Sequence, residues 1–387
     1  MTKTLRYGYT TGACATAAAR GAVLMLRDQH LLEEVEIILP TGDIARFRLH
    51  GQHFASDNAR CFVVKDAGDD PDVTNGAEIH AAVTLAESSG DEPVIIRGGT
   101  GIGRVTKPGL AVPPGEWAIN PVPRKLIAEA VNEIFSLHCP LLTAHSAPRI
   151  PEVTISIPNG AELAKKTLNE RLGIIGGLSI LGTTGIVKPI SGKAWTDTID
   201  VAIDVAVACG CKSLVLSTGR TSEAAAQRHL ATGFLADGRP GPEEMAKKGY
   251  RKLLRGISAE SYIMMGDHVG HALRACRQRG IRNVILAAQF AKLLKIACGH
   301  EQTHVSCSRL ELDRLREWLT ESPRTLRFAP FVRQANTARE VFETTDRAAA
   351  IISLVAARAI RFAEQVAPGL KVKVLLAGYG GEMVYFR

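Results

Sequence analysis

The segment SLVLSTGRTSEAAAQRHL, residues 213–230, decides the fold of the second half of the chain. It opens with an apolar stretch at 213–216, which predicts a buried strand, and continues through a polar loop at 217–222. A helix is predicted at 223–230, so the segment forms one strand-loop-helix step. Repeated steps of this kind give parallel strands covered by helices.

The same step recurs on both sides of this segment. The alternation predicts an open, mainly parallel sheet with helices on both faces, which is a three-layer, Rossmann-like α/β domain over residues 166–387. Ligands of such sheets bind at the carboxyl ends of the strands, here the loops at 217–222, 266–268, 289 and 378–381. Further strands are expected at 261–265, 283–288 and 371–376, and helices at 195–208, 268–278 and 290–297.

The first half has a different pattern of apolar and turn-forming residues. Short apolar alternations predict strands, and clusters of glycine, proline and aspartate separate them irregularly, so an α+β domain over residues 1–165 is expected. Its strands are expected at 35–39, 61–64, 94–96 and 153–157, and its helices at 13–27 and 124–135.

Composition narrows the possible ligands. The chain of 387 residues carries a formal net charge of +8, yet its lysines and arginines are dispersed and aromatic residues make up 5%. This disfavours nucleic acid and favours an acidic small molecule.

No apolar run approaches the roughly 20 residues that span a bilayer. Eight scattered cysteines and no recognisable signal peptide predict a cytoplasmic protein with reduced thiols.

Three segments of the first half carry candidate chemistry, each with a structural alternative. Thr10, Thr11 and Gly12 precede an alanine-rich helix, where free amides bind anions or a hydroxyl caps the helix. The stretch KDAGDDPD, residues 65–72, suggests a cation site, a general base, hydrogen bonds to a cationic cofactor or a polar turn. The stretch GGTGIGRVTKPGL, residues 98–110, suggests an anion-binding loop or a glycine-rich turn, without a dinucleotide or Walker pattern.

Three further groups lie beyond these. The stretch LGTTGIVKP, residues 181–189, predicts either a cleft or a hinge between the halves. His300, His304 and Cys307 have helical spacing, which suits either zinc or a polar active-site turn. Asp267, His268 and His271 form another histidine group, partly explained by a helix cap at Asp267. No arrangement typical of a covalent nucleophile is present in the sequence.

Read together, these segments resemble the CbiD family, the cobalt-precorrin-5B C(1)-methyltransferases. The resemblance runs from Gly8 to the C-terminal glycine-rich end. Many members carry a Gly-Asn-Tyr-Gly type turn where this chain has TGRT at 218–221, and Asn-Phe where it has Asp267-His268. The strings that carry the resemblance are GYTTG (8–12), KDAGDDPDVT (65–74), GIGRVTKPGL (101–110), INPVPR (119–124) and NERLGIIGGLSILGTTGIV (169–187).

The resemblance implies a two-domain enzyme that methylates carbon 1 of cobalt-precorrin-5B with S-adenosylmethionine, giving cobalt-precorrin-6A in anaerobic cobalamin biosynthesis. Cobalt then arrives with the substrate, and the protein binds no metal of its own. The adenosyl group is expected at the carboxyl edge of the second domain and the macrocycle between the domains. A homo-oligomer is compatible with the sequence. The competing interpretations are a nucleotide-binding kinase or dehydrogenase and a non-catalytic tetrapyrrole carrier.

The resemblance also suggests roles for individual residues. Basic side chains would pair with the acetate and propionate groups of the macrocycle. Asp69 or His304 would accept a proton or orient the ring. The expected substrate residues are Thr10, Thr11, Gly12, Gly101, Gly103, Arg104, Lys107, Arg124 and Lys188, and the expected cofactor residues are Gly182, Thr183, Thr184, Gly219, Asp267 and Gly380.

Overall fold

The computed structural model describes residues 5–87, 92–136, 149–232, 257–344 and 349–387. The chain divides into two compact units, unit 1 at Met1–Ser191 and unit 2 at Gly192–Arg387. This division falls later in the chain than the expected boundary between residues 165 and 166. The reason is that residues 174–187 pair with strands of unit 1. Strand β10 (Ile174–Ile175) pairs with β8 (Arg104–Val105), and β11 (Ile186–Val187) pairs with β1 (Gly8–Tyr9).

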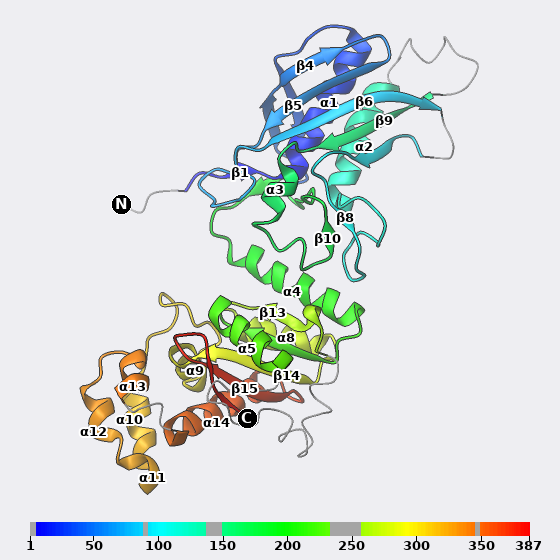
Figure 1. The fold of residues 1–387 in the computed structure, drawn as a ribbon. Coiled ribbons are helices and arrows are strands. Elements are labelled where there is room, and N and C mark those ends of the chain that lie inside the picture. Colours follow the sequence, from blue (N-terminus) through cyan, green and yellow to red (C-terminus); the bar gives the residue numbers. More distant parts are fainter. Residues whose placement is uncertain (1–4, 88–91, 137–148, 233–256, 345–348) are drawn as a thin grey trace. The chain divides into compact units, whose positions relative to one another are not determined.

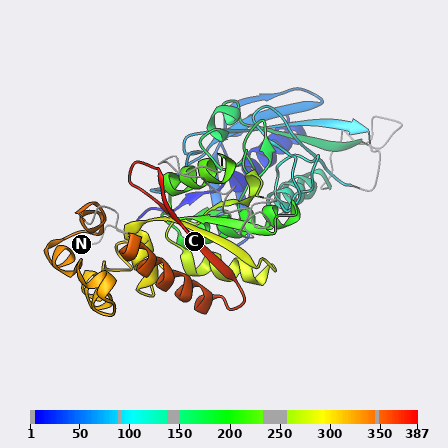
Figure 2. The ribbon, with the colours of Figure 1, turned by 60° about the horizontal axis from the view of Figure 1, so that its bottom comes forward.

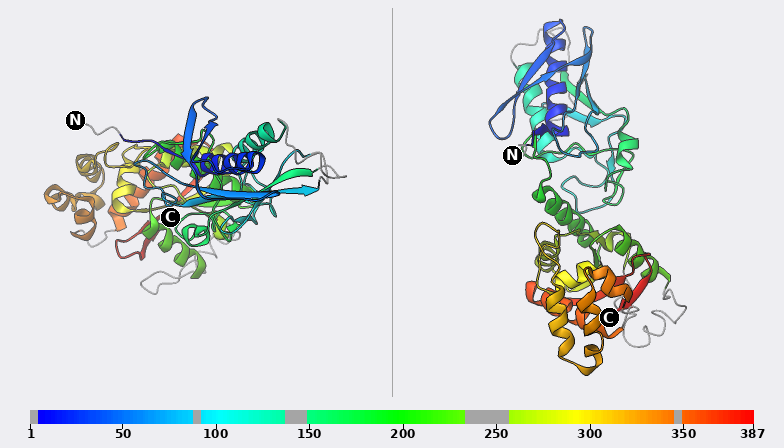
Figure 3. Two further views of the ribbon diagram at one scale, coloured as in Figure 1. Left: turned by 90° about the horizontal axis from the view of Figure 1, so that it is seen from above. Right: turned by 90° about the vertical axis from the view of Figure 1, so that its left-hand side faces the viewer.

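Unit 1 is built on a five-stranded sheet with the order β4-β5-β6-β9-β7. All neighbours pair antiparallel except β7 and β9, which are parallel. Helices α1 and α2 lie side by side, and α1 packs on β5 and β6 (Figures 1 and 3). The bounds are α1 (Thr11–Asp28), β4 (His50–Phe54), β5 (Asn58–Val64), β6 (Glu78–Glu87), β7 (Ile95–Gly98), α2 (Pro121–Ser136), β9 (Arg149–Ser156) and the short α3 (Gly160–Ala164).

The small residues of α1 explain its close fit against the rest of unit 1. Alanine predominates on its buried positions from Ala13 to Ala22, so the helix backbone approaches its neighbours closely. At Gly21 a Cβ atom would lie 2.6 Å from the Leu49 side chain. A separate hairpin, β2 (Glu34–Ile38) with β3 (Ile44–Arg48), also packs beside α1.

Unit 2 contains the parallel pairing that its alternating pattern predicts. Its sheet has the order β13-β12-β14-β15-β16, and the first four strands are parallel. The last strand pairs antiparallel with β15, which the alternation did not predict. The bounds are β12 (Ser213–Ser217), β13 (Tyr262–Met264), β14 (Asn283–Gln289), β15 (Lys371–Ala377) and β16 (Met383–Phe386).

Helices cover both faces of the unit 2 sheet. On one face a large apolar core joins the sheet to α4 (Gly192–Ala208), α8 (Val269–Gln278), α9 (Phe290–Ala297) and α14 (Ala349–Val366). On the other face Val215 and Ile285 pack with α5 (Arg220–Thr232). Short helices absent from the sequence prediction form a cluster, orange in Figure 2, in which α13 (Ala338–Thr344) packs on α9 and α11 (Pro323–Leu326) packs on α14. The helices α10 (Leu312–Thr320) and α12 (Ala329–Gln334) complete this cluster.

Within the described residues, no helix is both long and apolar enough to cross a membrane.

Candidate functional site

Three segments far apart in the sequence meet at the start of α1 in unit 1. Tyr9 N donates to Asp66 O at 2.7 Å, and Thr10 N donates to Gly185 O at 3.0 Å. Glycines make this approach possible, because a Cβ at Gly8 would lie 2.0 Å from the Ala67 carbonyl carbon. A Cβ at Gly182 would lie 2.3 Å from Thr10 Oγ1. We call this meeting of residues 6–12, 65–72 and 181–190 the glycine crossing.

The first amides of α1 have partners inside the protein. Thr10 caps the helix, since its Oγ1 accepts from Ala13 N at 3.1 Å. Gly12 N donates to Leu181 O at 2.8 Å, and Leu181 N donates to Thr11 Oγ1 at 2.9 Å. Of the two interpretations of Thr10, Thr11 and Gly12, the cap is present, and the amides of Gly12 and Ala13 are taken by protein oxygens.

The acidic segment 65–72 consists of individually bonded carboxylates. Asp66 pairs with Arg6, and this guanidinium lowers the pKa of Asp66. Asp69, the candidate base, is exposed and accepts from Arg6 N at 2.8 Å. Asp70 accepts from Ile190 N at 2.9 Å. These bonds show the polar turn of the sequence analysis, and they connect residues 66–70 to the other two segments of the glycine crossing.

The last carboxylate of this segment holds a buried cation. Lys65 is 2% exposed, and its Nζ donates to Asp72 at 2.7 Å. Burial raises the pKa of Asp72, but the hydrogen bonds from Lys65 and Thr74 outweigh it, so the net shift is downward.

The glycine-rich loop at 98–110 presents Arg104 on a fixed support. The Arg104 guanidinium lies 3.7 Å from the centre of the Trp117 ring, and its Nη1 donates to Gly115 O at 2.5 Å. A Cβ at Gly101 would lie 1.9 Å from Ile157 O, and one at Gly103 would lie 2.4 Å from the Ile174 side chain. The glycines therefore serve close packing, while the Arg104 side chain remains exposed.

The other predicted basic residues of unit 1 differ in exposure and in whether their donors are already bonded. Lys107 Nζ donates to Arg171 O at 3.2 Å, and Arg124 Nη1 makes a long contact of 3.4 Å with Ile96 O. Lys188 is exposed next to β11. Arg104 and Lys188 are thus the most accessible cations of the predicted set.

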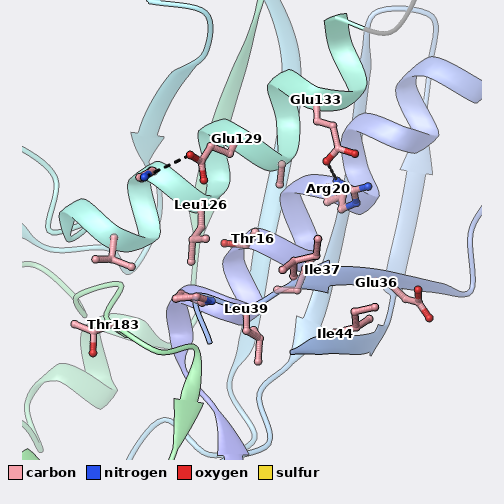
Figure 4. A pocket seen from close by; sticks show the side chains of 15 residues that line it. Thr16, Arg20, Glu36, Ile37, Leu39, Ile44, Leu126, Glu129, Glu133 and Thr183 are labelled. Carbon is pink, nitrogen blue, oxygen red and sulfur yellow. Dashed lines mark hydrogen bonds and ion pairs between the residues drawn. The ribbon is translucent and has the colours of Figure 1, made fainter. Parts of the chain in front are cut away.

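The sequence analysis did not foresee a groove of about 790 Å³ between α1, α2 and the β2–β3 hairpin (Figure 4). Its apolar lining includes Leu39, Leu126 and the exposed Ile44. Two ion pairs also line the groove. Arg20 pairs with Glu133 at 2.7 Å, and Lys125 pairs with Glu129 at 3.6 Å. Thr183 is the predicted site residue that lines it. The residues that line this groove form no sequence motif, so sequence reasoning could not find it.

In unit 2 the carboxyl ends of β12 and β13 lie together. The carbonyl of Ser217, the last residue of β12, accepts from Met265 N at 3.0 Å and from Gly266 N at 3.2 Å. Gly219 follows β12, and a Cβ there would meet nothing within 4 Å. The Ser217 side chain is 0% exposed, and its Oγ has no hydrogen-bond partner in the described part of the chain.

Asp267 lies in the loop after β13, where it is held by two neighbours. Lys292 pairs with its Oδ1, and Thr303 Oγ1 donates to the same oxygen at 2.6 Å. Burial raises the pKa of Asp267, but these bonds outweigh it and the pKa is lowered overall. Asp267 does not cap α8 with its side chain, because the cap position belongs to His268.

The histidines of unit 2 have separate partners. His271 contacts Asp200 at 3.1 Å, and His300 contacts Glu311 at 2.7 Å. His304, the other candidate base, is exposed and contacts Ser306 at 2.7 Å. Residues 300–307 are not helical, so the spacing that suggested zinc does not place three ligands on one face. Across the described ranges, no three His, Cys, Asp or Glu side chains gather as metal ligands.

The predicted cofactor residues are divided between the units. Gly182, Thr183 and Thr184 lie at the glycine crossing in unit 1, beside the predicted substrate residues Thr10 to Gly12. Gly219, Asp267 and Gly380 lie in loops that follow β12, β13 and β15 of unit 2. The expected cofactor set therefore draws its residues from both units.

Comparison with known proteins covers the whole chain. The family model described as CbiD matches residues 1–189. A Geobacter metallireducens protein named cobalt-precorrin-5B C(1)-methyltransferase is 57% identical over 389 residues, covering 100% of this chain and 99% of that protein. A Citrifermentans bemidjiense protein of the same name is 54% identical over 384 residues, covering 99% of each.

A solved structure from Archaeoglobus fulgidus, titled cobalamin biosynthesis protein (cbiD), is 28% identical and covers 81% of this chain and 84% of its own, with a TM-score of 0.37. The family assignment follows from the two full-length relatives. This chain belongs to the CbiD family.

Proposed function

We propose that this protein is a cobalt-precorrin-5B C(1)-methyltransferase that transfers the methyl group of S-adenosylmethionine to ring carbon 1 and yields cobalt-precorrin-6A in anaerobic cobalamin biosynthesis. The observation that carries this proposal is 57% identity over the whole length to a relative of that name. The cobalt ion belongs to the substrate.

We place the cofactor on unit 2, which we interpret as a Rossmann-like domain. Its first strand, β12, has β13 on one side and β14 on the other, and all three run parallel. In open sheets of this kind, ligands bind outside the carboxyl ends where the strand order changes direction. The unpartnered Oγ of Ser217 and the open space at Gly219 both lie at that position. These groups fit a ligand that brings polar atoms close to the backbone.

Asp267 suits the ribose of the cofactor. Lys292 and Thr303 occupy its Oδ1, which leaves Oδ2 as an acceptor for vicinal hydroxyl groups. Its lowered pKa keeps the group a carboxylate at neutral pH. Gly380 contributes a third loop at the same edge, after β15.

We place the macrocycle on unit 1. Its acetate and propionate groups require cations, and Arg104 stands exposed on Trp117 while Lys188 is exposed beside the glycine crossing. Lys107 and Arg124 are weaker candidates, because backbone oxygens already receive their donors. Since Gly182, Thr183 and Thr184 lie with Thr10 to Gly12, we assign all six to the substrate side.

When bound, S-adenosylmethionine supplies a methyl group that its sulfonium has already activated. The protein then has to hold the ring carbon and the methyl group in line and exclude water, without a covalent nucleophile. The basic side chains of unit 1 orient the macrocycle through its carboxylates. Asp69 or His304 accepts any proton that the ring releases.

Anaerobic incubation with cobalt-precorrin-5B and methyl-labelled S-adenosylmethionine tests this function. Mass spectrometry should show the macrocycle heavier by one labelled methyl group, and fragmentation should place the label at carbon 1. Macrocycle binding without any mass gain would instead support a tetrapyrrole carrier. Binding of ATP or NAD in preference to S-adenosylmethionine would support a kinase or dehydrogenase.

A further inference from the structure

Trp195, the fourth residue of α4, lies beside the loop that contains Asp267. Its Nε1 donates to Met265 O at 3.3 Å. The ring also lies against Gly266, where a Cβ would be 3.1 Å from the indole. Gly266 has φ +56°, a conformation that favours glycine, so this residue both turns the loop and makes room for the ring.

Trp195 is nevertheless 48% exposed, whereas guanidinium groups lie over the rings of the other two tryptophans. The guanidinium of Arg104 lies 3.7 Å from the centre of the Trp117 ring, and that of Arg358 lies 4.6 Å from the centre of the Trp318 ring. Among the described residues, no cation covers Trp195 in this way, and its aromatic neighbour His268 is 6.4 Å away between ring centres. A fixed aromatic face is therefore open to a planar ligand.

Two polar acceptors belong to the neighbours of this face, because Asp267 follows Gly266 and Gln302 contacts His268. Asp267, which follows Gly266, keeps Oδ2 available because Lys292 and Thr303 bond to Oδ1. Gln302 Nε2 contacts His268 Nδ1 at 3.2 Å, whereas the buried Gln302 Oε1 has no partner in the described part of the chain. An unbonded buried acceptor is costly unless a ligand donor reaches it.

We infer that Trp195, Asp267 and Gln302 form the adenosine-binding site of unit 2. Adenine stacks on the Trp195 indole, the ribose hydroxyls donate to Asp267 Oδ2, and the exocyclic amine donates to Gln302 Oε1. This inference rests on the proposed function and deepens it by naming which side chains recognise the nucleoside. A planar base, a vicinal diol and an amine donor occur together in adenosine, which matches the three groups.

Binding of S-adenosylhomocysteine to the full-length protein tests the inference, measured by calorimetry and by tryptophan emission. The wild type should bind with quenched emission, and Trp195→Leu should lose the quenching and bind about tenfold more weakly, as expected for loss of one base stack. Trp195→Phe should show an intermediate affinity, because it keeps a smaller aromatic face. Trp318→Phe is the matched control and should retain wild-type affinity and quenching.

Competition by adenosine and by 2′,3′-dideoxyadenosine tests the role of Asp267. Loss of the two hydroxyls should weaken competition by about tenfold in the wild type, because the donors to the Asp267 carboxylate are removed. It should leave competition unchanged in Asp267→Asn, where the charged acceptor is already absent. Thermal melts of each variant verify that unit 2 remains folded.

The outcomes separate this inference from the proposed function. If Trp195→Leu and Trp195→Phe bind S-adenosylhomocysteine like the wild type, the adenosine site is elsewhere, while methyl transfer by the wild type still upholds the function. If the wild type binds neither S-adenosylhomocysteine nor S-adenosylmethionine, both the inference and the cofactor assignment are wrong.

Discussion

The two units place their polar groups in opposite ways. In unit 1 the motifs that looked most chemical are bonded within the protein, since Asp66, Asp69 and Asp70 hold the backbone of the glycine crossing or Arg6. In unit 2 the carboxyl edge of a parallel sheet has a buried Ser217 Oγ without a partner among the described residues and open space at Gly219. The dense motifs of unit 1 therefore hold its own backbone together, whereas the loops of unit 2 are where we propose that the cofactor binds.

The largest effect is expected where glycine permits backbone contact in unit 1. Gly101 and Gly76 have nearly equal φ angles of +75° and +77°, but a Cβ would lie 1.9 Å from Ile157 O at Gly101 and would meet nothing within 4 Å at Gly76. Gly101→Ala should lower the free energy of unfolding by about 4 kcal/mol or more. Gly76→Ala should cost about 1 kcal/mol for the backbone conformation alone. Equal losses in urea denaturation would show that close packing does not define this loop.

The next effect concerns the buried pair of unit 1. Asp72→Asn leaves the Lys65 ammonium buried without a charge partner and should cost about 3 kcal/mol. Lys65→Met should cost less, because the Asp72 side chain is 25% exposed and is solvated more easily. Chemical denaturation of both variants measures the asymmetry, and a larger loss for Lys65→Met would contradict it.

The same pair predicts a pH dependence. The pKa of Asp72 is lowered in the folded state, so its stabilising contribution is present above the unfolded pKa of about 4. That contribution is lost as the pH falls through the lower folded value. Denaturation between pH 6 and pH 3 should therefore show a smaller acid-induced loss in Asp72→Asn than in the wild type, after allowance for its lower starting stability.

The two candidate bases allow the units to be compared directly in catalysis. Asp69 belongs to unit 1 and His304 to unit 2, and removal of a general base lowers kcat by about a hundredfold or more. We expect one of Asp69→Asn and His304→Ala to show this loss with macrocycle affinity unchanged, and the other to remain near wild type. If both variants keep full activity under anaerobic single-turnover conditions, neither residue accepts the proton.

A smaller effect is expected for the exposed cations. Arg104→Ala should weaken macrocycle binding by about tenfold, the value of one charge-assisted contact. Lys107→Ala should weaken it less, because Lys107 Nζ is already bonded to Arg171 O. Fluorescence or absorbance titration with the macrocycle measures both constants. Unchanged affinity of Arg104→Ala would remove the glycine-rich loop from the substrate surface.

The sequence predicted regular elements well where one period dominated. The strand at 213–216 and the helices at 13–27 and 195–208 are present with extended bounds. The prediction placed no strand between residues 64 and 94, so strand β6 (Glu78–Glu87) was not foreseen, although its apolar residues alternate in part. Strand β16 (Met383–Phe386) was missed because the prediction ended with the strand at 371–376, and the antiparallel direction of β16 depends on its tertiary pairing with β15.

Site residues were harder to predict than the fold. Motif composition marked Asp66 and Asp70 as chemical candidates, but their bonding partners Arg6 and Ile190 are distant in sequence. Trp195 carries no motif, and its role emerges when Gly266 and Met265 are seen to hold it. Long-range backbone contacts therefore decide which polar residues remain free, and single-sequence patterns do not encode those contacts.

The division of labour between the units is tested most directly by hydrogen–deuterium exchange of the full-length protein with each ligand. S-adenosylhomocysteine should slow exchange in unit 2, at residues 217–222 and 265–268, and cobalt-precorrin-5B should slow exchange in unit 1, at residues 98–110. Protection by S-adenosylhomocysteine confined to unit 1 would contradict the assignment of the cofactor to the open edge of the parallel sheet.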